Sequence, residues 1–392
     1  MEQRDAISAQ VGDEQFYRIT GTRNNPTTGL AKLLWVCENE HLRPAKLINC
    51  KDYIAYRLTG ELGTDYSDAS GTGAFDLNQF DWSDEILEAM GLSRAVMPEL
   101  QASVDLVGTV TAEAARASGL LVGTPVFRGC GDGTAATVGA GVTHKGECYC
   151  CLGSSAWVAC VDDSPLLDKE MRTFNLAGIQ KGSVFPIGTM QAAGVSYNWM
   201  RDELCQREQL EAERDGKDIY DCINSQIAQV PFGANGVIYL PYLLGERSPW
   251  WDDRAKGAFL GLQKSTTHAD MLRAVMEGIS YNLALNLAVL RQRHQFREIR
   301  VMGGCAKEVV WRQILADMFG LPVQKLSHLD EACSMGAAVV AGIGAGVFTD
   351  SGAVAKFVQT DGLSVPQPDA AEFYENQLGR FAESYRRLQG LF

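Results

Sequence analysis

The stretch FRGCGDGTAATVGAGV, residues 127–142, places a single carboxylate, Asp132, among closely spaced glycines. Pro125 and the apolar residues after it predict a strand that runs into these glycines, and the small residues that follow predict a helix. Glycine weakens both helices and strands, so this run indicates a turn where the backbone approaches a partner closely.

Asp132 has two interpretations at this turn. Its carboxylate could cap the following helix by accepting hydrogen bonds from free N–H groups. It could also be a general base, because an aspartate accepts the hydroxyl proton when a phosphoryl group is transferred to an alcohol. The local pattern leaves both interpretations open.

Two further glycine-rich turns follow predicted strands, in CLGSSAW (residues 151–157) and VMGGCAKE (residues 301–308). Small residues let the backbone approach a ligand, and free N–H groups can then hold phosphate oxygens. None of the three turns matches the P-loop pattern or the GxGxxG dinucleotide pattern. Together they predict a nucleotide site of another kind.

Composition narrows the class of partner. The 392-residue chain has a formal net charge of -13, which argues against nucleic acid and acidic membranes as partners. Its first ten residues are polar, and no apolar run is long enough to cross a bilayer. The scattered cysteines are typical of a reducing compartment. We therefore expect a cytoplasmic protein.

The sequence predicts no metal-binding residues. CYCC (residues 148–151) fits a strand, in which alternate side chains point to opposite faces. The histidines show no metal-ligand spacing, and His268 is expected on the surface in the first turn of a helix. That helix runs from about residue 268 to 294, and Thr267 with Asp270 predicts a capping box at its start.

Alternating strands and helices predict α/β layers, and the length predicts two domains, 1–142 and 143–392. GAFLGLQKSTTHADMLRAVME (residues 257–277) strongly resembles the C-terminal signature of the FGGY carbohydrate kinases. KLLWVCEN (32–39), TDYSDASGTGAFDL (64–77), GERSPWWD (245–252) and GAAVVAG (336–342) also resemble segments of this family, in order along the chain. Within the family, the sequence of these segments most resembles that of xylulokinase-like members.

The resemblance implies two actin-like, ribonuclease-H-like domains with ATP and the sugar in the cleft between them. Residues 1–142 would be the remainder of the sugar-side N-terminal domain, with Asp132 as the catalytic base and Gly133 beside the substrate. Residues 143–392 would be the ATP-side domain. ATP and Mg²⁺ are the implied cofactors, and the implied nucleotide-binding residues are Gly153, Ser154, Ser155, Thr266, Thr267, Gly303, Gly304, Cys305 and Glu308.

The implied function is ATP-dependent phosphorylation of a sugar hydroxyl, D-xylulose to D-xylulose 5-phosphate. The alternatives are gluconokinase, another ketose or polyol kinase, and a non-catalytic ATP-binding relative. An actin-like chaperone ATPase shares the fold, but the signature at residues 257–277 counts against it. A homodimer is compatible with the sequence.

Family members begin with a DxGTT hairpin whose aspartate helps to place magnesium, and this chain has no such hairpin. The resemblance therefore implies an N-terminally truncated chain with an incomplete first domain. We expect this chain alone to have little or no kinase activity.

Overall fold

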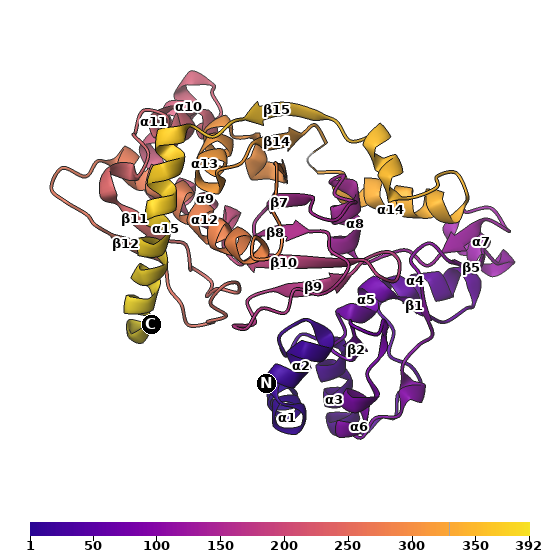
Figure 1. The fold of residues 1–392 in the computed structure, drawn as a ribbon. Coiled ribbons are helices and arrows are strands. Elements are labelled where there is room, and N and C mark those ends of the chain that lie inside the picture. The colour runs from indigo at the N-terminus through magenta and orange to yellow at the C-terminus, as the bar shows by residue number, and fades with distance from the viewer. Residues whose placement is uncertain (329) are drawn as a thin grey trace. The chain divides into compact units, whose positions relative to one another are not determined.

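The computed structural model of the protein describes residues 1–328 and 330–392 (Figure 1). These residues form two compact units, and neither is one continuous segment. The first unit consists of Met1–Gly146, Cys160–Pro186 and Glu331–Val358. The second consists of Glu147–Ala159, Ile187–Asp330 and Gln359–Phe392. The chain passes between these two compact units more than once. The domain boundary near residue 142 stays a prediction.

Short helices and two-stranded ribbons build the first unit. Its helices are α1 (Glu2–Val11), α2 (Asp13–Thr20), α3 (Gly29–Asn39), α4 (Cys50–Thr59), α5 (Tyr66–Ser70), α6 (Asp84–Ala89), α7 (Ala112–Ser118), α8 (Asp132–Gly139) and α14 (Ala332–Gly344). Its ribbons pair β1 (Thr64–Asp65) with β4 (Leu100–Gln101), β2 (Phe75–Asp76) with β3 (Asp81–Trp82), and β5 (Leu106–Thr109) with β6 (Pro125–Phe127). The main core of this unit collects Phe16, Leu30, Phe75 and Trp82, all buried.

A mixed sheet is the centre of the second unit. Its strands lie in the order β15-β14-β13-β7-β8-β10, and β9 (Phe174–Ala177), from the first unit's residues, is next after β10. The strands are β7 (Cys148–Leu152), β8 (Ala156–Cys160), β10 (Val184–Met190), β13 (Ile299–Met302), β14 (Val323–Leu326) and β15 (Thr360–Ser364). β13 runs parallel to both β7 and β14. Every residue of β7 is buried, so its cysteines serve as apolar core residues.

The remaining elements of the second unit are mainly helices: α9 (Gly194–Leu204), α10 (Gln206–Asp215), α11 (Ile219–Ile227), α12 (His268–Leu290), α13 (Val309–Phe319) and α15 (Pro368–Leu388). A small ribbon pairs β11 (Ile238–Leu240) with β12 (Ala258–Leu260). Within the described residues, no helix combines the length and the apolar character needed to cross a membrane.

The predicted capping box starts α12. The Asp270 N–H donates to Thr267 Oγ1 at 3.2 Å, and the Thr267 N–H donates to Asp270 Oδ2 at 2.8 Å. These two bonds satisfy free donors at the helix start. The helix also buries charged groups, because Arg273 pairs with Glu277 at 2.6 Å inside the protein and Tyr374 donates to the same carboxylate.

Close backbone contact joins α8 and α14, which lie side by side in the first unit (Figure 1). A Cβ atom added to Gly336 would stand only 1.9 Å from the carbonyl oxygen of Ala135. Only glycine allows this approach, and α14 thereby supports the helix that begins at Asp132.

We predict that Gly336→Ala lowers the melting temperature, because the added methyl group forces the two helices apart at a cost of about 1–3 kcal/mol. Gly379→Ala is the matched control. Gly379 also lies within a helix, but no atom comes within 4 Å of its added Cβ, so this variant should melt at or above the wild-type temperature. Thermal denaturation measures both, and equal melting of the two variants would contradict the packing described here.

Candidate active site

Asp132 is the first residue of α8, and its side chain is exposed. The N-cap is Gly131, so the capping interpretation of Asp132 is wrong by one position. The carboxylate still contributes to the helix start, because the Gly133 N–H donates to Asp132 Oδ1 at 2.7 Å. Asp132 thus combines a fixed orientation with access from solvent, and both are compatible with a general base.

A buried hydrogen-bond chain holds the turn before α8. The Gly131 N–H donates to Ser67 Oγ at 2.8 Å. Ser67 in turn donates to Asp65 Oδ2 at 2.5 Å, and Ser103 donates to the same oxygen at 2.8 Å. Asp65 is fully buried, so these donors offset the cost of removing its charge from water. The sequence identified this segment only as family-like and gave its residues no role.

Lys51 carries the positive charge of this cluster. Its Nζ lies 2.7 Å from Asp52, 3.2 Å from Asp65 and 3.4 Å from Asp68. Burial would lower the pKa of Lys51, but the three carboxylates outweigh it and raise the pKa. Nζ also donates to the Arg128 carbonyl at 3.1 Å, which ties the cluster to the strand that leads into the turn.

Asp68 is the second carboxyl group beside this turn. Its Oδ1 lies 2.9 Å from the point where a Cβ of residue 131 would stand. Burial raises the pKa of Asp68 to about 6, even though the ammonium group of Lys51 acts to lower it. The sequence signal for this carboxyl cluster was the spacing of Asp65 and Asp68 at a helix start. Residues three apart lie on the same side of a helix.

The other predicted substrate residue, Gly133, lies one position further along α8. A Cβ atom there would come within 3.1 Å of Leu176 Cδ1, so a side chain at this position would displace Leu176. Position 133 is partly exposed, next to the exposed Asp132. Both predicted sugar-side residues therefore lie at one accessible helix end.

In the second unit, the LGSS turn joins β7 to β8 as predicted. The Gly194 N–H donates to the Gly153 carbonyl at 3.0 Å, and the Val195 N–H donates to the Ser154 carbonyl at 3.1 Å. The start of α9 thus fixes the turn. The Ser154 side chain is exposed, and the described residues give its hydroxyl group no hydrogen-bond partner. That hydroxyl is free to bind a ligand.

The GGCAKE turn lies beside the LGSS turn at the carboxyl ends of two adjacent strands of the sheet. β13 pairs in parallel with β7, with Met302 opposite Cys151, so both turns follow the carboxyl ends of adjacent strands. Gly303 has φ 91°, and a Cβ there would stand 2.6 Å from the Leu152 carbonyl oxygen. In open α/β sheets, ligands bind outside the carboxyl ends of the strands. The structure therefore brings Gly153 and Gly303 together at such an edge.

Three more predicted residues lie on the same turn. Gly304 begins a short 3₁₀ helix, and no atom lies within 4 Å of a Cβ added there. Burial and the nearby Glu308 raise the pKa of Cys305 to about 11. Glu308 is the N-cap residue of α13 and accepts a hydrogen bond from Asn224. Burial first, and then Asp221 and Asp218, raise the pKa of Glu308.

Thr266 and Thr267 lie just before α12. The Thr266 hydroxyl oxygen accepts the Gln263 N–H at 2.9 Å, and Thr267 takes part in the capping box. No hydrogen bond among the described residues links either threonine to the turns at Gly153 and Gly303. Their role toward the nucleotide phosphates stays a prediction.

Comparison with known proteins identifies the class of this protein as a carbohydrate kinase. The FGGY family of carbohydrate kinases matches this chain twice, with its N-terminal domain over residues 1–139 and its C-terminal domain over residues 148–345. The chain belongs to the FGGY family. It is therefore a sugar phosphotransferase that uses ATP as the phosphoryl donor, as predicted.

Individual relatives include more than one sugar specificity. Xylulose kinase of Bacillus subtilis (strain 168) is 30% identical over 377 residues, 94% of this chain and 73% of that protein. Gluconokinase of the same organism is 30% identical over 392 residues, 98% of this chain and 76% of that protein.

Solved structures resemble the whole chain. The ligand-bound xylulose kinase from Lactobacillus acidophilus matches with a TM-score of 0.90 and 27% identity, over 98% of this chain and 77% of that one. The gluconate kinase from Lactobacillus acidophilus matches with a TM-score of 0.91 and 27% identity, over the same shares of the two chains. The predicted fold class, with two actin-like, ribonuclease-H-like domains, is confirmed. The incomplete first domain stays a prediction.

We predict that Asp68→Asn becomes more stable relative to the wild type as the pH rises from 4 to 7. The Asp68 pKa is about 6 in the folded protein and ordinarily 3.8. Between these values the folded protein keeps a proton that the unfolded chain has released, so rising pH removes stability. Asparagine has no such proton to lose.

Melting temperatures measured across this pH range test the shift. Asp253→Asn, at an exposed carboxylate, is the control for the loss of one carboxyl group. A difference between Asp68→Asn and the wild type that stays constant with pH would contradict the raised pKa of Asp68.

Proposed function

We propose that this kinase phosphorylates D-xylulose to D-xylulose 5-phosphate, with Asp132 as the general base. The observation that carries the catalytic part is the exposed Asp132 carboxylate, held at the start of α8 by the Gly133 N–H. The sugar assignment is supported by the xylulose kinases among the relatives. Gluconate is the second candidate, supported by gluconokinases of similar identity.

In the proposed reaction, a sugar hydroxyl oxygen attacks the γ-phosphorus of ATP while its proton passes to an Asp132 oxygen. The bond between the γ-phosphorus and the β–γ bridging oxygen breaks, and ADP leaves with that electron pair. The Gly133 N–H keeps Oδ1 in place, so Oδ2 is the oxygen available to the incoming hydroxyl. General-base catalysis of this kind contributes about 10²–10⁴-fold to a rate.

The nucleotide would lie at the strand-end turns of the second unit. Gly153, Ser154 and Ser155 would hold phosphate oxygens, and the free Ser154 hydroxyl supports this role. The turn from Gly303 to Glu308 would contact the adenosine, since Gly304 leaves open space for it. Thr266 and Thr267 are proposed near the phosphates.

Magnesium fits this arrangement. Mg²⁺ would enter with the phosphate oxygens of ATP, because it prefers oxygen ligands and is commonly held by substrate phosphates. When bound, it would neutralise the charge that develops on the transferred group. Cytoplasmic location and homodimer formation stay predictions.

A panel of acceptors tests the substrate. ADP release with Mg-ATP is measured for D-xylulose, L-ribulose, D-gluconate, glycerol and a control without sugar. We expect the highest kcat/KM for D-xylulose. A higher kcat/KM for D-gluconate would contradict the xylulose assignment, and rates equal to the no-sugar control throughout would favour the non-catalytic alternative.

The nucleotide face is tested by Gly304→Val. We predict an unchanged melting temperature, because no protein atom lies within 4 Å of the added Cβ, but a Kd for ATP raised at least about tenfold, or about 1.4 kcal/mol. The cause would be direct collision with the nucleotide. Gly379→Val, which also has open space around its Cβ, is the control and should bind ATP like the wild type. Wild-type ATP affinity in Gly304→Val would place the nucleotide elsewhere.

A further inference from the structure

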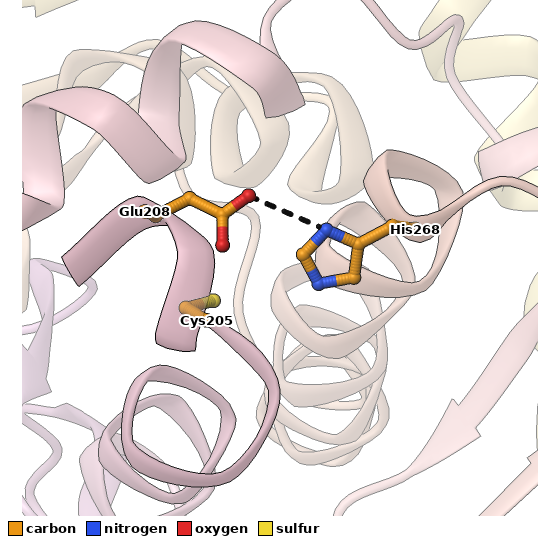
Figure 2. A group of neighbouring side chains, drawn as sticks. All are labelled: Cys205, Glu208 and His268. Carbon is orange, nitrogen blue, oxygen red and sulfur yellow. Dashed lines mark ion pairs between the residues drawn. The ribbon is translucent and has the colours of Figure 1, made fainter. Parts of the chain in front are cut away.

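Three potential metal ligands converge in the second unit, apart from the turns described above. Cys205 is the N-cap residue of α10, Glu208 lies in the first turn of that helix, and His268 is the first residue of α12 (Figure 2). Their sulfur, oxygen and nitrogen donor atoms all lie within 4.8 Å of one another. Two helices that are distant in sequence therefore present three different donor types to one point.

One carboxylate oxygen of Glu208 has no hydrogen-bond partner at this site. Its side chain is only 2% exposed, and Oε1 accepts a hydrogen bond from Gln226 at 2.7 Å. The His268 Nδ1 lies 3.5 Å from the same oxygen. The other oxygen, Oε2, is buried and has no hydrogen-bond partner among the described residues. Burying a carboxylate oxygen without a partner is costly, so a cation or a hydrogen-bond donor beside Glu208 Oε2 would stabilise the protein.

The surroundings suit a transition metal better than a hard cation. Cys205 is completely buried, whereas the His268 side chain is 40% exposed and leaves one side open to solvent. Sulfur and imidazole donors favour Zn²⁺ and similar ions, while Mg²⁺ and Ca²⁺ prefer oxygen ligands. Tetrahedral zinc sites with three protein ligands keep their fourth position for water.

We propose that Cys205 Sγ, a Glu208 carboxylate oxygen and a His268 imidazole nitrogen bind one divalent transition-metal ion of the Zn²⁺ type, with solvent as the fourth ligand. The ion would connect α10 to the start of α12. It would also satisfy Glu208 Oε2. This site is separate from the Mg²⁺ that accompanies ATP, and its test does not depend on kinase activity.

Cobalt provides the direct readout. The full chain is stripped of metal with a chelator and titrated with Co²⁺, whose visible and near-ultraviolet absorption reports tetrahedral geometry and thiolate coordination. We expect saturation at one Co²⁺ per chain, with a thiolate-to-cobalt band that Zn²⁺ abolishes by displacement. Zn²⁺ should also raise the melting temperature, because it binds the folded state.

Variants assign the ligands. Cys205→Ser should lose the thiolate band, and His268→Ala should raise the Kd for Co²⁺ at least tenfold. His268→Ala keeps the capping residues Thr267 and Asp270, so it tests the site even if the buried Cys205→Ser variant fails to fold. Cys222→Ser and His41→Ala are the controls, a partly buried thiol on α11 and an exposed imidazole.

Wild-type titration without a thiolate band would overturn the proposal. The same conclusion would follow if His268→Ala bound Co²⁺ as tightly as the wild type, or if the band vanished in Cys222→Ser. In those cases Glu208 and His268 would form no more than a weak ion pair.

Discussion

The hydrogen bond from the Gly131 N–H to Ser67 Oγ fixes the turn on which the proposed chemistry depends. Ser67 can accept it in this orientation because its own proton goes to Asp65. Asp65 stays buried because Lys51 and Ser103 contact it. The Lys51 ammonium group thus holds together three carboxyl groups that would otherwise repel one another. Removing the charge of one sign from such a cluster leaves buried charge of the other sign without compensation. The rigid element is the turn, and Asp132 projects from it into solvent.

The proposed nucleotide side depends on a different constraint, the close approach of backbones at the carboxyl ends of β7 and β13. Gly303 lies against the carbonyl of Leu152, so no side chain stands between the ends of β13 and β7. The exposed groups there include the Ser154 hydroxyl, the open face of Gly304 and the Lys307 side chain. Such a surface suits phosphate and a nucleoside, because both need hydrogen-bond donors and open space. The acidic net charge of the chain is compatible with this, because a local anion site does not need a basic surface.

Local chemistry explains what the sequence could predict. The Thr267–Asp270 capping box and the glycine turns after β7 and β13 are short-range features. The family signature at residues 257–277 includes the capping box. Contacts between distant segments had no such signal. The small residues of α14 pack closely against α8, but nothing in their sequence identifies α8 as the partner.

The same limit applies to the clusters of charged and donor groups. Lys51 and Asp68 meet beside Gly131 only through the tertiary fold, and Cys205 reaches His268 in the same way. The capping interpretation of Asp132 failed for a smaller reason. The helix begins at Asp132 itself, with Gly131 as its N-cap, and element boundaries are uncertain by a residue or two from sequence.

The most direct test of the account is the rate of ADP release by Asp132→Asn compared with the wild type, at saturating Mg-ATP and with the best sugar of the panel. Asparagine keeps the size of the side chain and cannot accept the hydroxyl proton. The account predicts a rate lower by about 10²–10⁴-fold with ATP affinity unchanged, while Asp253→Asn stays at the wild-type rate. An Asp132→Asn rate near that of the wild type would contradict the assignment of Asp132 as the base.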